Sequence, residues 1–180
     1  SRGLGDVYKR QSPFMLVTAI AIKAYDGGPV LYSQKRLTTG GRVFKVYKFR
    51  SMIVDAEKKS GATLAKKNDS RITPIGKFIR KVRIDELPQL VNVLKGNMSL
   101  VGPRPEIPFY VNDFKDKIPM YMIKHQVKPG ITGLAQVNGY RGDTSIAKRI
   151  ECDLYYVENW TLWLDFKILF LTFFGRDVNK

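Results

Sequence analysis

An adjacent pair of carboxylates, Asp85 and Glu86, is the feature of this sequence with the clearest chemical potential. It lies in the stretch "RKVRIDELPQLVNVLKGNMSLVGPRPE", after a basic run and before a proline. Asp is among the best helix N-cap residues, so Asp85 can be a structural cap, with Glu86 opposing the helix dipole. A helix N-terminus would equally keep Asp85 ionised and exposed as a nucleophile, and would gather positive potential that binds phosphate. The pair alone leaves both interpretations open.

Three basic residues from separate segments, Lys48, Arg80 and Arg104, favour the chemical interpretation if they converge on the pair. Taken singly, each is most simply a solvated surface group. Arg104 stands between two prolines, whose fixed φ angles reduce the entropy lost when its side chain clamps a ligand. A carboxylate nucleophile with such cations suits phosphoryl transfer, whose transition state spreads charge over phosphoryl oxygens. Mg²⁺ held by Asp85 and phosphate oxygens would offset the repulsion between that carboxylate and a diphosphate.

The composition is that of a basic globular chain with an anionic partner. Its 180 residues carry a net charge of +15, from 31 Lys+Arg against 16 Asp+Glu, and 44% of them are hydrophobic. This balance indicates a nucleic acid, an anionic lipid or a phosphorylated substrate. No helix-turn-helix, RNP, zinc-finger or GXXG signature is present, so we expect no nucleic-acid partner. The single cysteine excludes an internal disulfide and a CxxC metal site.

The hydrophobic and turn patterns around these residues predict a fold that mixes helices with a few strands. Apolar residues favour a helix over Phe14–Lys23, and "DGGP" ends it. "VLYSQKR" and "RVFKVYKFRSM" flank "LTTGG" and predict a β-hairpin. Thr73 and Pro74 suit the start of a second helix, whose apolar residues recur at helical spacing. A third helix is expected to begin at Asp85 and to end at "KG", at residues 95–96.

The second half of the chain combines turn-rich and apolar segments. "GPRPEIP" is expected to be extended, and "VKPGITGLAQVNGYRGD" irregular. A helix is expected around Ile146, Ile150, Leu154 and Val157. "WTLWLDFKILFLTFF" is apolar nearly all round, is short for a membrane span, and suits a membrane interface. We therefore predict one predominantly helical α+β domain with a small β-hairpin and amphipathic interfacial helices.

Four long motifs give the sequence a family resemblance. "YKFRSM", the Arg80–Glu106 stretch, "VKPGITGLAQVNGYRGDT" and "YYVENWTLWLDFKILFLT" resemble the bacterial sugar transferases that are monotopic phosphoglycosyl transferases. The resemblance covers about Ser12 to Thr172, with its motifs in the family's order. "NGYRGDT" and "ENWTLWLDFKI" look most like the exopolysaccharide-type undecaprenyl-phosphate glucose phosphotransferases.

The resemblance implies a two-step reaction. Asp85 would attack the sugar-bearing phosphate of a UDP-hexose, either UDP-glucose or UDP-galactose, and release UMP. Undecaprenyl phosphate would then take the hexose phosphate from the phosphosugar-aspartyl intermediate. This is the initiating step of exopolysaccharide, capsule or O-antigen-type glycan synthesis, and we expect it to depend on Mg²⁺.

The resemblance also assigns roles to particular residues of this chain. Glu86 would handle protons or support the metal. Lys48, Arg80 and Arg104 would bind phosphate, and Arg141 in "NGYRGD" would contact the nucleotide. Two further alternatives remain, in which the chain catalyses nothing: a basic nucleic-acid-binding protein, and a membrane scaffold protein in which the acidic pair is only a cap.

The start of the chain carries expectations about the membrane. The family has a re-entrant membrane helix broken at a Ser-Pro, which matches Ser12 and Pro13, and a compact monotopic domain on the cytoplasmic face of the bacterial inner membrane. Residues 1–11 resemble translated read-through of a sequencing adapter. We therefore expect residues 1–11 to be foreign, 12–28 to be the remainder of the re-entrant helix, and 29–180 to be the catalytic domain.

Overall fold

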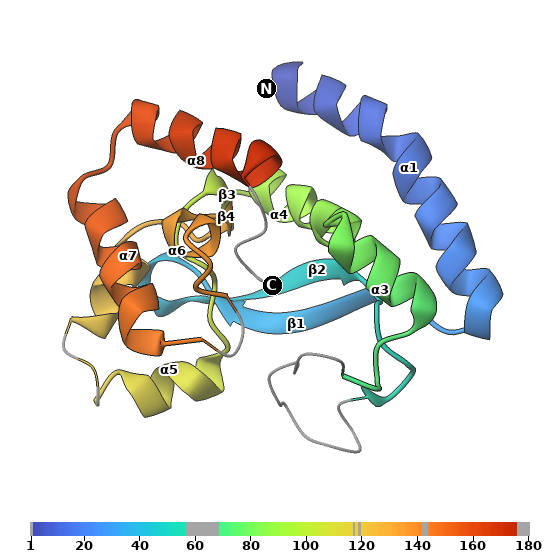
Figure 1. Ribbon diagram of the computed structural model, residues 1–180, viewed down its shortest axis with the longest axis horizontal. Helices are drawn as coiled ribbons and strands as arrows, with labels where there is room; N and C mark the ends of the chain where they lie inside the picture. The colour runs from blue at the N-terminus through green and yellow to red at the C-terminus, as the bar shows by residue number, and fades with distance from the viewer. Residues whose placement is uncertain (1, 57–68, 117, 119, 142–143, 176–180) are drawn as a thin grey trace. The chain divides into compact units, whose positions relative to one another are not determined.

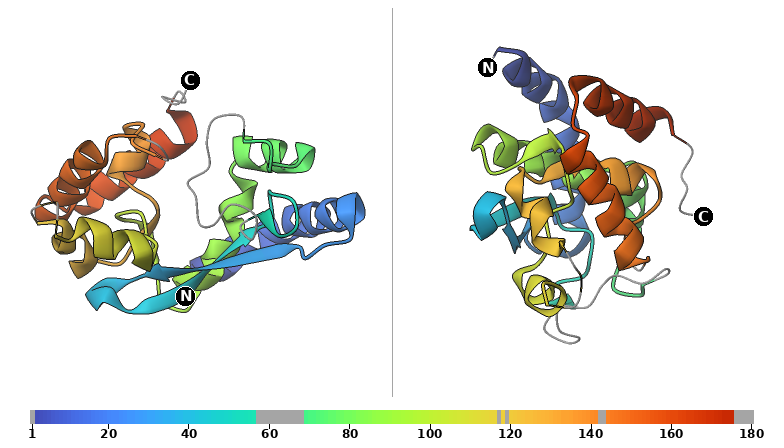
Figure 2. Two further views of the ribbon diagram at one scale, coloured as in Figure 1. Left: turned by 90° about the horizontal axis from the view of Figure 1, so that it is seen from below. Right: turned by 90° about the vertical axis from the view of Figure 1, so that its left-hand side faces the viewer.

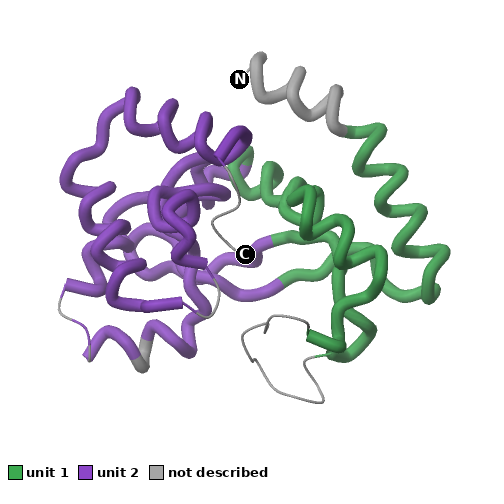
Figure 3. The backbone as a smooth tube through the Cα atoms, viewed as in Figure 1, with its two compact units in different colours: residues 1–33, 47–94 green, residues 34–46, 95–180 purple. Residues whose placement is uncertain are grey.

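The protein is described here by a computed structural model that covers residues 2–56, 69–116, 118, 120–141 and 144–175 (Figure 1). It is predominantly helical, with two small sheets of two strands each, which confirms the predicted mixture of helix and strand. The chain forms two compact units (Figure 3). Unit 1 comprises residues 1–33 and 47–94, and unit 2 comprises residues 34–46 and 95–180.

The predicted β-hairpin is confirmed. Strands β1 (Leu31–Leu37) and β2 (Val43–Phe49) pair with each other, and the turn η1 (Thr39–Gly41) joins them. Gly40 and Gly41 have φ values of 69° and 72°, a left-handed conformation that glycine adopts at little cost. The "GG" of the sequence therefore sets the turn.

Unit 1 is built from helices around a small apolar core. Its elements are α1 (Arg2–Asp26), α3 (Pro74–Lys81), the 3-10 helix η2 (Ile84–Gln89) and α4 (Leu90–Leu94). Thr73 caps α3 by accepting a hydrogen bond from the Gly76 N–H at 2.9 Å, and Pro74 opens the helix, as predicted. The core consists of buried residues from α1, β2 and α3, namely Ile22, Phe49 and Ile79.

Helix α1 differs from its prediction at one end. It begins at Arg2 instead of Phe14 and continues through Pro13, although proline removes one backbone hydrogen bond. The break expected at Ser12 and Pro13 is therefore not an end of α1, and its role in a membrane hairpin stays a prediction. Among the described residues, no helix is both long enough and apolar enough to span a bilayer.

Unit 2 contains a parallel strand pair that the sequence analysis did not predict. β3 (Ser99–Val101) pairs with β4 (Gly130–Thr132), with Ser99 opposite Gly130 and Val101 opposite Thr132. The segment "VKPGITGLAQVNGYRGD" therefore holds β4 and the short helix α6 (Leu134–Val137), so calling all of it irregular was wrong. Strands of three residues are too short to show an alternating pattern.

The remaining elements of unit 2 are helical. They are α5 (Pro108–Phe114), the 3-10 helix η3 (Tyr121–Gln126), α7 (Ile146–Glu158) and α8 (Leu162–Phe174). α7 confirms the helix predicted there, and a short link joins it to α8, which runs in a different direction (Figure 2). One cluster packs Leu37, Val111, Tyr121 and Ile150 together, and a second packs Val101, Tyr156 and Ile168.

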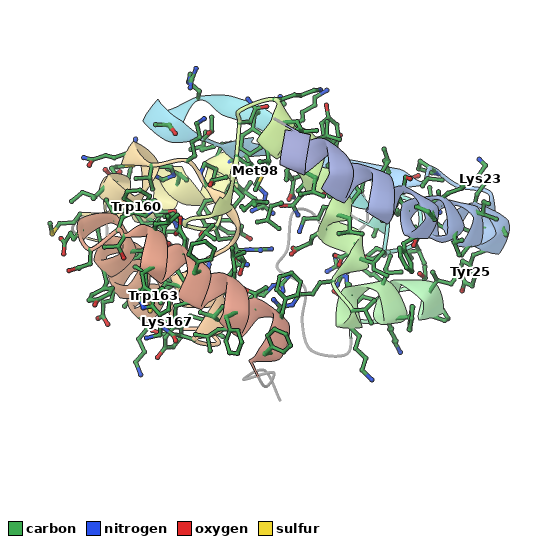
Figure 4. The ribbon with its side chains drawn as sticks, turned by 90° about the horizontal axis from the view of Figure 1, so that it is seen from above. Lys23, Tyr25, Met98, Trp160, Trp163 and Lys167 are labelled. Carbon is green, nitrogen blue, oxygen red and sulfur yellow. The ribbon has the colours of Figure 1, made fainter. Side chains whose placement is uncertain are left out.

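Helix α8 has one buried side and one exposed apolar side. Ile168 is fully buried, whereas Trp163 and Phe173 are each 78% exposed. Figure 4 shows Trp160, Trp163 and Lys167 along this helix and its approach. Asp165 accepts hydrogen bonds from the Tyr156 hydroxyl at 2.8 Å and the Trp160 indole N–H at 3.2 Å, so the start of α8 is tied to α7.

Candidate active site

The acidic pair lies in a turn whose backbone conformation is unusual. After α3, Arg83 adopts a left-handed conformation (φ 58°, ψ 17°), and its N–H donates to the Arg80 carbonyl at 3.2 Å. Ile84 then packs against the apolar core of unit 1. Asp85 and Glu86 are the second and third residues of η2, and the packing of Ile84 anchors the start of this turn.

The helix expected to begin at Asp85 begins one residue earlier, at Ile84 of η2, so Asp85 is near the N-cap and not at it. Arg83 holds that position, and no side chain caps the turn. Pro88 lies inside η2 and has no N–H to give, which suits a short 3-10 helix followed by α4 better than one continuous α-helix from Asp85.

Burial corrects a second expectation, that Asp85 is exposed. Asp85 is 7% exposed and Glu86 is 5% exposed. A buried carboxylate is costly unless charge or hydrogen bonds compensate it. Lys48 provides this for Glu86, because its ammonium nitrogen lies 2.9 Å from Oε1. The pair is therefore held in a shielded setting where electrostatic interactions are strong.

Lys48 reaches this carboxylate from strand β2. The N–H of the preceding residue, Tyr47, donates to Oδ1 of Asn92 at 3.2 Å, and Asn92 is almost completely buried in α4. The lysine side chain stays 20% exposed. Because an ammonium group carries three N–H donors, Lys48 can contact Glu86 and a ligand oxygen at the same time.

Arg80 is fixed by the segment that follows β2. Its Nε–H donates to Oγ of Ser51 at 2.7 Å, and the Ser51 carbonyl accepts the Thr73 N–H at 3.1 Å. This segment lies so close to α3 that a Cβ at Gly76 would sit 1.9 Å from the Ser51 carbonyl oxygen. The planar Arg80 guanidinium carries further N–H groups, with the geometry that phosphate oxygens accept.

The structure places the other two predicted basic residues in unit 2. Arg104 lies in the segment between β3 and α5 and is partly exposed; this segment bends at residues 102–103, and the last residue of "GPRPEIP" already begins α5, so the extended conformation predicted for all of it is not found throughout. Arg141 follows α6, is also partly exposed, and its N–H donates to the Gly139 carbonyl at 3.0 Å. Lys48, Arg80 and the acidic pair thus share unit 1, whereas Arg104 and Arg141 belong to unit 2.

Several supporting residues were not predicted from the sequence. Ser51 accepts a hydrogen bond from Arg80, and Asn92 accepts one from the backbone N–H of Tyr47, the residue before Lys48. His125, the sole histidine, is buried, and burial together with the charge of Lys124 lowers its pKa to about 4. It is therefore neutral near neutral pH, as suits a structural residue.

The carboxylate oxygens of Asp85 and Glu86 are suitable ligands for a magnesium ion that binds together with its phosphate substrate. Within the described ranges, no group of three or more His, Cys, Asp or Glu residues gathers as a metal site. Mg²⁺ commonly takes only one or two protein carboxylates and completes its shell with water and substrate phosphates. Asp85, with Glu86 beside it, can supply that small set.

Comparison with known proteins shows the family. The chain matches the family described as "Bacterial sugar transferase" over residues 8–176, and it belongs to that family. It is 50% identical over 173 residues to the UDP-glucose:undecaprenyl-phosphate glucose-1-phosphate transferase of Klebsiella pneumoniae, covering 94% of this chain and 37% of that protein. The Escherichia coli (strain K12) protein of the same name is 47% identical, with the same coverage of both chains.

A further relative differs in the sugar of its name. The UDP-N-acetylgalactosamine-undecaprenyl-phosphate N-acetylgalactosaminephosphotransferase of Aeromonas hydrophila is 52% identical over 163 residues, which cover 89% of this chain and 38% of that protein. The chain thus spans less than two fifths of the length of these three relatives.

Proposed function

We propose that this protein transfers a hexose 1-phosphate from a UDP-hexose to undecaprenyl phosphate and releases UMP. The observation that carries the proposal is the buried Asp85–Glu86 pair, with Lys48 on Glu86 and Arg80 one turn earlier, in a member of the bacterial sugar transferase family. The three relatives described above are named for this reaction type.

Asp85 is the nucleophile in this mechanism. One of its carboxylate oxygens attacks the phosphorus that bears the sugar, and the bond from that phosphorus to the UMP oxygen breaks, with the electron pair leaving on UMP. A phosphate oxygen of undecaprenyl phosphate then attacks the same phosphorus. The bond to Asp85 breaks, which regenerates the carboxylate and gives undecaprenyl-diphosphate-hexose.

The basic residues bind the charge that moves during both steps. Lys48 and Arg80 contact phosphoryl oxygens near the acidic pair. For Arg104 and Arg141, binding of the diphosphate and the nucleotide stays a prediction from the family resemblance. Cations preorganised in a shielded site stabilise a transition state more than they would in water. Glu86 holds Lys48 in place and supports proton handling or the metal.

Magnesium completes the proposed site. Asp85 would hold the ion together with substrate phosphate oxygens, with support from Glu86. When bound, Mg²⁺ supplies charge neutralisation between the carboxylate and the diphosphate.

The proposed location is the cytoplasmic face of the bacterial inner membrane, where undecaprenyl phosphate would be available. Each unit supports this with its own exposed apolar surface: Phe14, Val17 and Ile20 on α1, and Trp163, Phe166, Phe170 and Phe173 on α8. Aromatic side chains are favoured at membrane interfaces, and a charge of +15 favours anionic lipid. Trp163→Glu should weaken binding to anionic vesicles, and unchanged binding would count against this placement.

The proposed reaction is tested by UMP release from UDP-glucose, UDP-galactose and UDP-N-acetylgalactosamine, with Mg²⁺ in detergent and without lipid acceptor. We expect a burst of about one UMP per protein with the correct donor. Asp85→Asn should abolish the burst, and Glu158→Gln, an exposed acidic residue on α7, should retain it. Equal release from the wild type and Asp85→Asn would refute the assignment.

A further inference from the structure

The segment that carries Arg104 is held almost entirely inside unit 2. Of residues 101–106, which run from the end of β3 toward α5, five are buried and Arg104 alone is partly exposed. Such a pattern is unusual for a connecting segment, because buried loop backbone needs internal hydrogen-bond partners. The partners of this segment are consequently informative.

On the N-terminal side of Arg104, the backbone is joined to β4. Gly102 N–H donates to the Thr132 carbonyl at 2.9 Å, and the Pro103 carbonyl accepts the Gly130 N–H at 2.9 Å. The two segments lie so close that a Cβ at Gly130 would sit 2.2 Å from the Gly102 nitrogen. No side chain fits between them, so this end of the segment is fixed.

On the C-terminal side, the backbone is joined to β1. The Pro105 carbonyl accepts a hydrogen bond from Nη1 of Arg36 at 2.9 Å, and the Glu106 carbonyl accepts the Leu37 N–H at 3.1 Å. Arg104 thus stands between Pro103, whose carbonyl is bound by β4, and Pro105, whose carbonyl is bound by Arg36 of β1.

The Glu106 side chain adds a third attachment. Its Oε1 lies 3.3 Å from Nζ of Lys124 on η3 and 3.4 Å from Nη1 of Arg149 on α7. Lys124 also contacts Oδ2 of Asp153 at 3.0 Å. Burial acts to raise the pKa of Glu106, but Lys124 and then Arg149 outweigh it and hold that pKa below its usual value. The carboxylate therefore stays ionised between its two cations.

We infer that Glu106, through its buried contacts with Lys124 and Arg149, is a positioning residue that fixes the Arg104 guanidinium for phosphate binding. The inference rests on the proposed function, because Arg104 is the phosphate ligand only in that reaction. A rigid backbone spares the entropy of ordering the segment that carries Arg104 when substrate binds, and small misplacements of a binding group cost as much as ~10²-fold in rate. Nothing in this role requires Glu106 to touch the substrate.

A double-mutant cycle tests whether Glu106 acts through Arg104. UMP release would be measured for the wild type, Glu106→Gln, Arg104→Ala and the double variant, with KM and kcat separated. We expect Glu106→Gln to raise KM for the UDP-sugar by roughly tenfold or more, and to have little further effect once Arg104 is absent. Ile22→Val, a core change in unit 1, controls for loss of stability alone.

Hydrogen exchange gives a readout that does not depend on catalysis. The amides of Leu37 and Gly130 are bound to the carbonyls of Glu106 and Pro103, so their exchange reports how firmly the segment is held. Glu106→Gln should speed exchange of both amides by roughly tenfold or more. Glu151→Gln, an exposed change on α7, should leave them as in the wild type.

The outcomes separate the two proposals. Additive effects of Glu106→Gln and Arg104→Ala, or unchanged exchange at Leu37 and Gly130, would overturn the positioning role even if the wild type releases UMP. If the wild type releases no UMP from any donor, the proposed reaction fails. Faster exchange in Glu106→Gln would then still support a held segment, and unchanged exchange would overturn that as well.

Discussion

Glu86 in unit 1 and Glu106 in unit 2 are both buried glutamates paired with lysine, yet their lysines differ. The side chain of Lys48, the partner of Glu86, is 20% exposed, whereas that of Lys124, the partner of Glu106, is 2% exposed. A partly exposed cation can donate to a ligand as well as to its glutamate. A fully buried cation can only hold its own carboxylates in place.

This difference shows that burial and ion pairing do not by themselves distinguish a reacting site from a positioning site. Both carboxylates need compensation in a medium of low dielectric constant. What distinguishes them is whether substrate can reach the compensating cation. On this criterion we propose that the Lys48–Glu86 pair takes part in the chemistry, and that the Lys124–Glu106 pair belongs to the framework that carries Arg104.

The largest expected effects come from removing each lysine in turn. Lys48→Met should reduce UMP release by roughly 10²-fold or more because a phosphate ligand is lost, and should also lower stability because Glu86 stays buried without this cation. Lys124→Met leaves Glu106 and Asp153 buried without their shared cation, and should lower the free energy of unfolding by about 3–5 kcal/mol. Both variants would be measured by chemical denaturation and by UMP release. A larger loss of stability in Lys48→Met, or a larger loss of UMP release in Lys124→Met, would contradict the comparison.

A pair of glycine substitutions sharpens the comparison through backbone packing. Gly76→Ala would place a Cβ 1.9 Å from the Ser51 carbonyl oxygen in unit 1, and Gly133→Ala would place one 2.2 Å from the Gly102 carbonyl oxygen in unit 2. Each should cost about 1–3 kcal/mol of stability, since backbone must shift. Lys77→Ala, on the exposed side of α3, is the control. Unfolding curves identical to the wild type would show that the close approaches are not needed.

The smallest expected effect is a pH dependence that belongs to unit 2. Burial and Lys124 lower the pKa of His125 from 6.5 to about 4, so the unfolded chain takes up this proton first as the pH falls. Stability should therefore decline below about pH 6.5, by about 1 kcal/mol at pH 5.5. His125→Gln should remove this decline, as measured by denaturation at several pH values. A decline that persists in His125→Gln would assign it to another group.

In unit 1, the ion pair of Asp26 and Arg50 should not titrate between pH 7 and 5. A hydrogen bond from Arg50 lowers the pKa of Asp26 from 3.8 to about 2, against the opposing effect of burial. This lowered pKa contributes stability that is present above about pH 4 and is lost as the pH falls toward 2. Between pH 7 and 5 the contribution of Asp26 is therefore constant, and the change that His125 causes can be seen against it.

The sequence was most informative where local chemistry decides the structure. Thr73 and Pro74 specify the start of α3, and the glycine pair at 40–41 specifies the hairpin turn. The acidic pair and its basic companions were found from residue type and motif. Their local geometry was not, because the left-handed conformation at Arg83 leaves no pattern in the sequence, and Ile84 anchors the turn only through tertiary packing.

The features that the sequence did not reveal depend on contacts between distant segments. Glu106 follows a proline-flanked arginine and resembles an exposed loop residue, and only folding brings it to Lys124 and Arg149. The β3–β4 pair likewise joins segments about thirty residues apart, with close approaches that only Gly102 and Gly130 allow. The expectations for residues 1–11, 12–28 and 29–180 as separate regions stay predictions.

The central claim is that Asp85 becomes covalently bound to a hexose phosphate. The most direct measurement is the intact mass of the protein after incubation with the active UDP-sugar and Mg²⁺ and without lipid acceptor, followed by mass analysis of the peptide that contains Asp85. The account predicts a mass increase of one hexose phosphate on that peptide, which disappears on addition of undecaprenyl phosphate and never forms in Asp85→Asn. UMP release by a protein of unchanged mass, or an adduct on a different residue, would contradict it.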